Sequence, residues 1–136
     1  MSIQKELFQY VFDSSALINI KRNSKMRFLQ RRKGAILIPE KVAQEINHPM
    51  VRLDDPLRKF ISKYPQVVTQ FQNNEGDEYL RIRSQPGIHD GEASAMAIAL
   101  KRNYPLVIDE KDTKATGKAK NHGINTLNWQ EFLERS

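Results

Sequence analysis

The chain has 136 residues, which fits one domain that can bury a hydrophobic core without covalent or metal cross-links. It contains no cysteine, so disulfide frameworks and thiolate metal sites are excluded, and a reducing compartment is favoured. The net charge of +6 is compatible with a polyanionic partner. Because the sequence has neither a secretory signal pattern nor an apolar run near the roughly 18 residues of a membrane span, we expect a cytoplasmic protein without a membrane partner.

The first half of the chain alternates strand patterns with helical patterns. Apolar runs predict strands, and apolar residues at intervals of three and four predict helices. Strands are expected at 8–12 and 35–38. Helices are expected at 15–21 and 26–32, between these strands, and at 40–46 and 56–64, after the second strand. Pro39 ends the second strand and suits the start of the helix after it.

The second half continues this alternation. Strands are expected at 66–71, 105–108 and 124–127. Helices are expected at 76–84 and 91–102, after the first of these strands, and at 114–123, after the second. A closing turn or two of helix begins near Trp129. Strands that alternate with helices indicate right-handed crossovers and a parallel sheet covered on both faces. We therefore expect one α/β domain over residues 1–136.

Four acidic residues occupy positions that a parallel sheet would direct toward one edge. Asp13 and Asp109 each follow a predicted strand directly. Glu45 lies at the border of the apolar stripe of the helix over 40–46, and Glu92 opens the helix over 91–102. In open α/β sheets, ligands bind beyond the carboxyl ends of the strands. The pattern therefore predicts a site at this edge.

Each acid also has an ordinary structural explanation. Asp13 suits the N-cap of a helix, and Asp90 and Glu92 suit a first helical turn. Glu45 reads equally as a solvated helix residue, and Asp109 as the start of a turn. Taken together, however, clustered carboxylates would repel one another unless a cation neutralised them. Their oxygens suit Mg²⁺ or Mn²⁺, ions that serve phosphodiester chemistry.

Basic residues are concentrated in two segments. Seven Lys and Arg residues and no acid lie between residues 21 and 33, beginning with Lys21 and Arg22. The second segment contains four lysines, Lys111, Lys114, Lys118 and Lys120. Solvated helix faces or contacts with phosphates explain either segment. Because both adjoin the acidic motifs, we expect nucleic-acid contacts from the residues nearest to those motifs, Lys21, Arg22, Lys111 and Lys114.

Four motifs in order carry a resemblance to a known family. They are VFDSSALI, IPEKVAQEI, HDGEASAMAIALK and LVIDEKDTKATGKAKNHGI, and they span about residues 8–128. This set resembles the PIN-domain ribonucleases, which include the VapC-type toxins of toxin–antitoxin pairs. The third motif looks closest to the subgroup with Gly-Glu-Ala. The chain departs from that subgroup at Lys114, where an Arg is common, and at GINTLNW, where a Gly-Thr is common.

The resemblance implies a PIN-like three-layer α/β/α sandwich with a central, mostly parallel sheet of about five strands. It implies a metal-dependent endoribonuclease that leaves a 5′-phosphate and a 3′-hydroxyl, acts on RNA, forms a homodimer and is held inactive by a small antitoxin. The family's catalytic acids fall on Asp13, Glu45, Glu92 and Asp109. The same four residues, together with Asp112, would bind Mg²⁺ or Mn²⁺. Ser14, Ser15 and Asp90 are accessory candidates.

Other polar residues are interpreted as structural. His48, His89 and His122 are expected in loops or at helix ends rather than at the metal. Ser14 and Ser15 have no candidate base in the sequence, so a serine nucleophile is not expected.

Two alternatives stay open. The first is a catalytically inactive PIN-like module that binds RNA or acts as a scaffold, although an inactive member tends to lose acids that are intact here. The second is a phosphoacceptor receiver domain, which expects two adjacent acids after the first strand. Here Ser14 follows Asp13, so this alternative ranks lower.

Overall fold

A five-stranded sheet in the order β3-β2-β1-β4-β5 forms the centre of the computed structural model, which describes residues 8–109, 117–120 and 122–135. All four neighbouring strand pairs are parallel. The strands are β1 (Tyr10–Phe12), β2 (Ile36–Pro39), β3 (Val68–Thr69), β4 (Leu106–Val107) and β5 (Thr126–Leu127). The predicted α/β fold with a five-stranded parallel sheet is confirmed.

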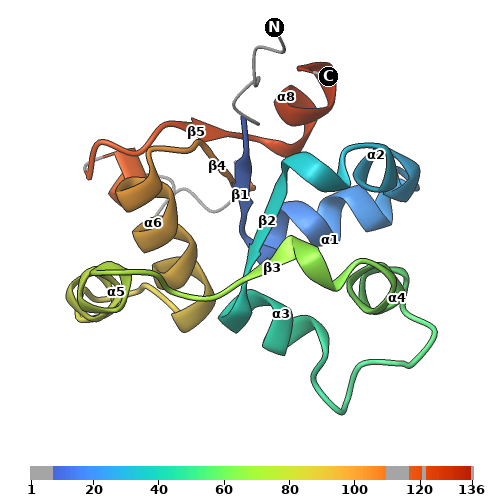
Figure 1. Cartoon of the computed structure of the whole chain (residues 1–136), viewed down its shortest axis with the longest axis horizontal. Helices are drawn as coiled ribbons and strands as arrows, with labels where there is room; N and C mark the ends of the chain where they lie inside the picture. Colours follow the sequence, from blue (N-terminus) through green and yellow to red (C-terminus); the bar gives the residue numbers. More distant parts are fainter. Residues whose placement is uncertain (1–7, 110–116, 121, 136) are drawn as a thin grey trace, which may run out of the picture.

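Helices cover both faces of this sheet. They are α1 (Ser14–Arg22), α2 (Met26–Arg31), α3 (Glu40–Ile46), α4 (Pro56–Lys63), α5 (Glu75–Arg83), α6 (Asp90–Arg102) and α8 (Trp129–Glu134). Figure 1 shows α5 and α6 on one side of the sheet and α1, α2 and α4 on the other, with α3 beyond the ends of β1 and β2. No helix in the described part of the chain is long and apolar enough to span a bilayer.

Alternating side chains along the central strands divide the core into two layers. Phe12 of β1 packs with α1, α2, α3 and α4, whereas its neighbour Val11 packs with α5 and α6. On β4, Val107 and Leu106 divide in the same way. Successive side chains of a strand point to opposite faces, so a strand covered on both sides is apolar throughout. This explains why the short strands appear in the sequence as continuous apolar runs.

The boundaries differ from expectation mainly at β3. A strand was expected over 66–71, but only Val68–Thr69 pairs with the sheet. The start of the expected strand is lost because Pro65–Val67 forms a 3₁₀ turn. Proline fixes φ near the helical value and has no N–H for a ladder, which favours the turn. In the helix expected over 114–123, residues 117–120 are helical, and residues 110–116 and 121 lie outside the described residues.

Candidate active site at the carboxyl edge of the sheet

Asp13 leaves the central strand and begins α1. Its backbone N–H still donates to the carbonyl of Val107 on β4 at 3.0 Å, so the residue is fixed by the sheet ladder. Its carboxylate Oδ2 accepts hydrogen bonds from the Ser15 hydroxyl at 2.8 Å and the Ser15 N–H at 3.4 Å. The side chain is only 2% exposed. Asp13 is therefore both a helix cap and a buried carboxylate at the carboxyl edge.

The Ser15 hydroxyl links the ends of two neighbouring strands. It donates to Asp13 after β1 and accepts from the backbone N–H of Asp109, which follows β4, at 3.0 Å. A hydroxyl can donate once and accept at the same time, so one side chain satisfies both partners. The two predicted acids at the strand ends are thus held beside each other by Ser15.

The start of α6 supplies two further acids in different environments. Glu92 is 7% exposed, and its Oε1 accepts the backbone N–H of His89 at 3.2 Å, an arrangement that caps the helix. Asp90 is exposed, forms an ion pair with Arg83 and accepts a hydrogen bond from the Tyr79 hydroxyl at 2.9 Å. The Arg83 guanidinium, followed by Tyr79, holds the pKa of Asp90 below its usual range. Asp90 is accordingly an ionised carboxylate already matched by a cation.

Glu45 extends from the last turn of α3 to the first turn of α6. Its carboxylate lies where a side chain on Gly91 would stand: a Cβ built there would be 3.1 Å from Cδ and 3.3 Å from Oε2 of Glu45, and closer still to Oε1. Partial burial, followed by the charges of Asp13 and Asp90, raises the pKa of Glu45, although a hydrogen bond from Ser14 acts in the opposite direction. The ionisation of Glu45 is therefore opposed by its partial burial and by its acidic neighbours.

These side chains line one pocket of about 580 Å³, which we call the acidic pocket. Its lining residues are Asp13, Ser14, Ser15, Ile18, Glu45, Arg83, His89, Asp90 and Glu92. Three of the four main predicted acids are thus brought together, with both accessory serines and Asp90. Asp109 is joined to the group through Ser15 rather than lining the pocket. Asp112, Lys111 and Lys114 lie outside the described residues.

The chemistry of the acidic pocket fits a hard divalent cation. Its acidic lining residues offer carboxylate oxygens, the ligands that Mg²⁺ and Mn²⁺ prefer. The pKa of Glu45 is raised by burial and, to a smaller extent, by the charges of Asp13 and Asp90, and a bound cation would offset both effects. Within the described ranges, however, no three His, Asp or Glu side chains converge closely enough to enclose an ion. The donor set therefore matches the predicted metal, and its carboxylates would have to draw together around it.

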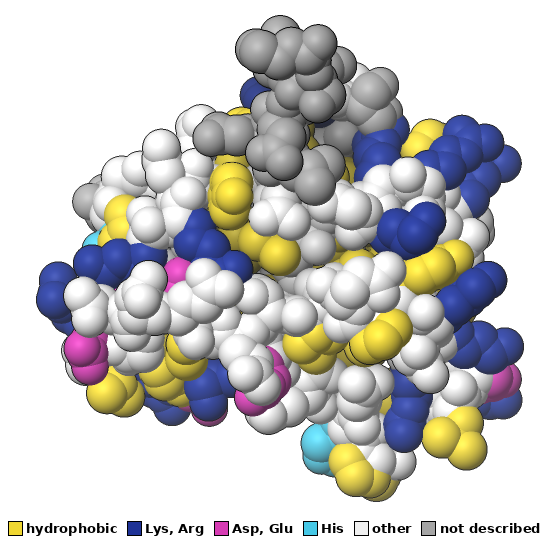
Figure 2. Space-filling view, in the orientation of Figure 1, with side chains coloured by type: hydrophobic (Ala, Val, Ile, Leu, Met, Phe, Trp, Pro, Cys, Tyr) yellow, Lys and Arg dark blue, Asp and Glu magenta, His cyan; other side chains and the backbone are white. Residues whose placement is uncertain are grey.

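The two basic residues predicted on α1 have different surroundings. Lys21 is half-buried and donates to Asp55 at 2.8 Å, whereas Arg22 is exposed at the end of the helix. Figure 2 shows Lys and Arg side chains gathered along the edge that α2 and α4 form. This basic edge lies on the same side of the sheet as α1, which carries Lys21 and Arg22, and further Lys and Arg side chains lie on the α5 side (Figure 1 and Figure 2).

Two polar residues of the acidic pocket, Arg83 and His89, were missed by the sequence analysis. His89 was interpreted as a loop residue, yet it lines the pocket one position ahead of α6. Its adjacency to Asp90 and Glu92 was the available signal. Arg83 lies at the end of α5 and enters the pocket because α5 packs against α6. No local pattern marks that packing, so its role could not be read from the sequence.

Ser15→Ala is expected to weaken both the fold and the site. The substitution removes the hydroxyl that joins Asp13 to the Asp109 N–H, and we expect a loss of about 1–2 kcal/mol in the free energy of unfolding. Urea unfolding measures this loss, and Ser15→Thr, which restores a hydroxyl, serves as the control. Equal stability of Ser15→Ala and the wild type would contradict the bridging role.

Comparisons with known proteins agree with this geometry. Residues 9–127 match the profile of a family described as a PIN domain. The crystal structure of PAE2754 from Pyrobaculum aerophilum resembles the chain with a TM-score of 0.63 and 19% sequence identity, covering 93% of this chain and 95% of that one. At this identity the likeness shows the fold. No curated protein matches the sequence significantly.

Proposed function

The chain belongs to the PIN-domain family, whose members are generally nucleases, and on this premise we propose that it is a metal-dependent endoribonuclease. The observation that carries the proposal is the acidic pocket, in which Asp13, Glu45 and Glu92 from three separate segments meet at the carboxyl edge of a parallel sheet. Two of these carboxylates, Asp13 and Glu92, are almost fully buried. Carboxylates are rarely buried unless a partner or a function retains them.

The residues of the pocket have distinct roles in this proposal. Asp13, Glu45, Glu92 and Asp109, with Asp112, would hold Mg²⁺ or Mn²⁺. When bound, such an ion supplies Lewis acidity toward phosphate oxygens and toward the attacking water. Ser15 fixes the carboxylate of Asp13 in one orientation through its 2.8 Å hydrogen bond. Arg83 contributes positive charge at the pocket, where it can contact a phosphate oxygen of the backbone.

The finer features of the proposal rest on the family resemblance. They are RNA rather than DNA as substrate, products with a 5′-phosphate and a 3′-hydroxyl, and a VapC-type toxin role with a small antitoxin, a homodimeric state and a cytoplasmic location. Lys21, Arg22, Lys111 and Lys114 would contact RNA, and residues 1–136 would form one PIN-like domain. The net charge of +6 favours a polyanionic substrate.

A cleavage assay tests the function directly. The purified protein is incubated with a structured RNA in Mn²⁺ and, in parallel, in excess EDTA, and the products are resolved on a denaturing gel. We expect internal cleavage in Mn²⁺ alone, with products that a 5′-phosphate-dependent exonuclease degrades. RNA that stays intact in Mn²⁺ and in Mg²⁺ but is still bound would favour the inactive RNA-binding module instead.

Glu45→Gln is expected to stabilise the metal-free protein at neutral pH. Because the pKa of Glu45 is raised in the folded state, folding favours its protonated form, and stability falls as the pH rises from the unfolded-state pKa through the folded-state pKa. Glutamine has no charge to bury, so the Tm of Glu45→Gln in EDTA should exceed that of the wild type at pH 8 and converge with it in acid.

The same melting experiment reports on the ion. Mn²⁺ should raise the Tm of the wild type by mass action and raise that of Glu45→Gln by less, because the variant lacks one charged ligand. A variant that melts below the wild type in EDTA at pH 8 would contradict the unfavourable ionisation of Glu45. An equal Mn²⁺ response in both proteins would remove Glu45 from the ligand set.

A further inference from the structure

A second cavity of about 130 Å³ adjoins the acidic pocket, and we call it the side slot. Its lining residues come from α1, α3, the loop after α3 and the start of α4, and they are Ser14, Ile18, Lys21, Glu45, Ile46, Val51, Asp55 and Leu57. Ser14, Ile18 and Glu45 line both cavities, so the side slot lies directly beside the acidic pocket. A ligand that extends from the acidic pocket along these shared residues would reach the side slot.

Helix α1 forms the wall along which the two cavities connect. Ser14, Ile18 and Lys21 are four and three residues apart, so they lie on one face of the helix. The rise of about 1.5 Å per residue separates the first from the last by roughly 10 Å. Lys21 thus lies about two helical turns along α1 from Ser14, on the same face of the helix.

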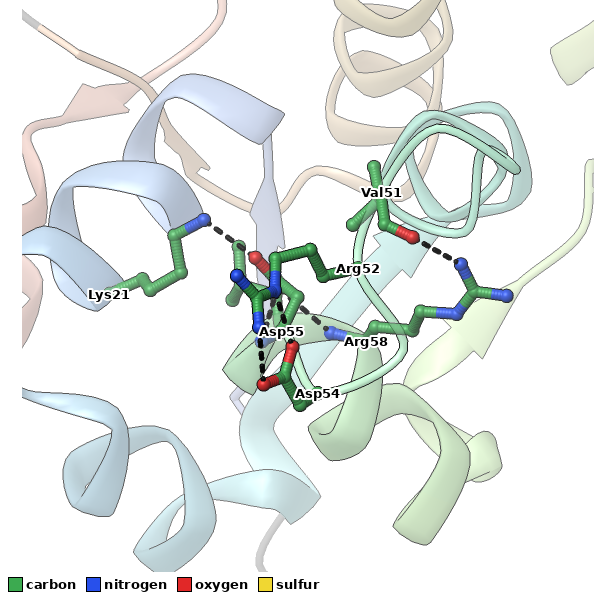
Figure 3. Close-up of polar contacts among 7 residues, drawn as sticks. Lys21, Val51, Arg52, Asp54, Asp55 and Arg58 are labelled. Carbon is green, nitrogen blue, oxygen red and sulfur yellow. Dashed lines mark hydrogen bonds and ion pairs between the residues drawn. The ribbon is translucent and has the colours of Figure 1, made fainter.

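An ion pair places the Lys21 ammonium at the far end of the side slot. Figure 3 shows Lys21 reaching from α1 toward Asp55 at the start of α4, with Oδ2 of Asp55 accepting at 2.8 Å. The other oxygen of Asp55 accepts from the N–H groups of Leu57 at 2.9 Å and Arg58 at 3.3 Å. The ammonium has three donors, and within the described residues Asp55 is its one acceptor. Lys21 is therefore fixed in place with donors left for a ligand.

The loop that closes the slot is also fixed. One guanidinium nitrogen of Arg58 donates to the backbone carbonyls of Val51 at 3.0 Å and His48 at 3.3 Å, and Figure 3 shows the first of these contacts. Arg52 and Asp54 form an ion pair at 3.0 Å within the same loop. Val51 is thereby held as one wall of the slot. A site whose walls are preorganised loses less conformational entropy when it binds.

We propose that the side slot holds one nucleobase of the RNA substrate, next to the scissile phosphate, with Lys21 donating to an acceptor on the edge of the base. This inference rests on the proposed ribonuclease function. Apolar walls from Ile18, Ile46 and Leu57 suit the faces of a flat ring and would leave a phosphate poorly solvated. Flipped-out bases are read in this way, between apolar side chains and through hydrogen bonds to their edges.

The ammonium of Lys21 at the end of the slot should favour bases that present hydrogen-bond acceptors. Guanine presents two adjacent acceptors, O6 and N7, and uracil and cytosine each present carbonyl oxygens. Adenine places an amino donor beside its N7 acceptor, and Lys21 cannot accept from that amino group. Asp55 also lines the slot, but Lys21 and the N–H groups of Leu57 and Arg58 already use three of the roughly four acceptor sites of its carboxylate. We therefore expect the enzyme to discriminate against adenine at one nucleotide flanking the cleaved bond.

Short single-stranded RNAs that differ in one base test the proposal. A cleaved sequence is prepared with A, G, C, U or an abasic residue on either side of the scissile bond, and kcat/KM is measured for each. At one flanking position, we expect kcat/KM for the best base to exceed kcat/KM for adenine and for the abasic residue by about tenfold. This ratio corresponds to the loss of one charged hydrogen bond. Lys21→Met, which removes the donor, and Val51→Phe, which fills the slot, should each reduce this ratio below about twofold.

The control and the contrary outcomes separate this inference from the function itself. Lys59→Ala removes an exposed lysine of α4 outside the slot and should keep the base preference. Wild-type cleavage without any base preference, or a preference that both slot variants retain, overturns the side slot alone. The slot could instead bind a protein, since Met50 and Leu53 of the same loop are exposed. In that case the base preference of Val51→Phe would equal that of the wild type, and a protein that co-purifies with the wild type would be absent from Val51→Phe. Absence of all RNA cleavage overturns the proposed function and the slot together.

Discussion

Asp13→Asn should lower the rate of RNA cleavage by about 10³-fold, the scale seen when a central catalytic group is removed. The change removes a negative charge and replaces one carboxylate oxygen with an amide nitrogen that cannot bind a cation. The fold should survive, since Asn caps helices as well as Asp does and its remaining oxygen can still accept from the Ser15 hydroxyl. Single-turnover cleavage in Mn²⁺ and the urea midpoint measure the two effects.

A control of similar burial distinguishes the site from a general effect of lost charge. Glu78 is 5% exposed against 2% for Asp13, and it pairs with Arg81 and Lys101 outside the acidic pocket. Glu78→Gln should leave the cleavage rate within about twofold, with any loss confined to stability. If Asp13→Asn cleaved RNA at half the wild-type rate or more, Asp13 would be a helix cap and no more.

The structural and functional explanations of the acids turn out to be compatible. Asp13 caps α1 with one carboxylate oxygen and Glu92 caps α6 with one of its own, and both residues also line the acidic pocket. A carboxylate has two oxygens and about four acceptor sites, so one contact does not exhaust it. The capping hydrogen bond fixes the orientation of each carboxylate at the pocket, so no further residue is needed to hold it. The sequence pattern of a helix cap is therefore no argument against a catalytic role at the same position.

Much of the fold was predictable because strong local signals and topology agreed. Alternate residues of β1 and β4 are buried in the two core layers on opposite faces of the sheet, so both strands are apolar throughout. Continuous apolar runs in the sequence therefore predicted both strands. The acids after both strands were placed by the rule that parallel strands share a carboxyl edge. The short β3 could not be foreseen from its apolar residues alone, because Pro65 diverts the backbone into a turn.

The rest of the site depends on contacts between elements far apart in sequence. Arg83 reaches the acidic pocket only because α5 packs beside α6. Lys21 was predicted to contact nucleic acid from its charge, but its fixed position depends on Asp55, 34 residues later. Glu45 was placed at the border of core and solvent by its helical wheel, while its contact with Gly91 follows from how α3 meets α6. Such distances between elements have no signature in a single sequence.

Gly91→Ala should lower RNA cleavage by about 10²-fold without destabilising the fold, because displacement of a catalytic group by about 1 Å can cost that much. The added methyl would occupy the space of the Glu45 carboxylate, which must swing away from the acidic pocket. Gly91 has no left-handed backbone, and alanine favours a helix by up to about 1 kcal/mol over glycine. The free energy of unfolding should therefore stay level or rise while cleavage falls.

The chain offers a matched control and a rescue for this variant. Gly76 is also the second residue of its helix, α5, but a Cβ there would meet only Phe71, at 4.0 Å. Gly76→Ala should gain similar stability and cleave RNA at the wild-type rate. Glu45→Asp in the Gly91→Ala background shortens the displaced side chain by one methylene, and it should recover part of the lost activity, a coupling that a double-mutant cycle measures. Wild-type cleavage by Gly91→Ala alone would show that the position of the Glu45 carboxylate against α6 does not matter to the reaction.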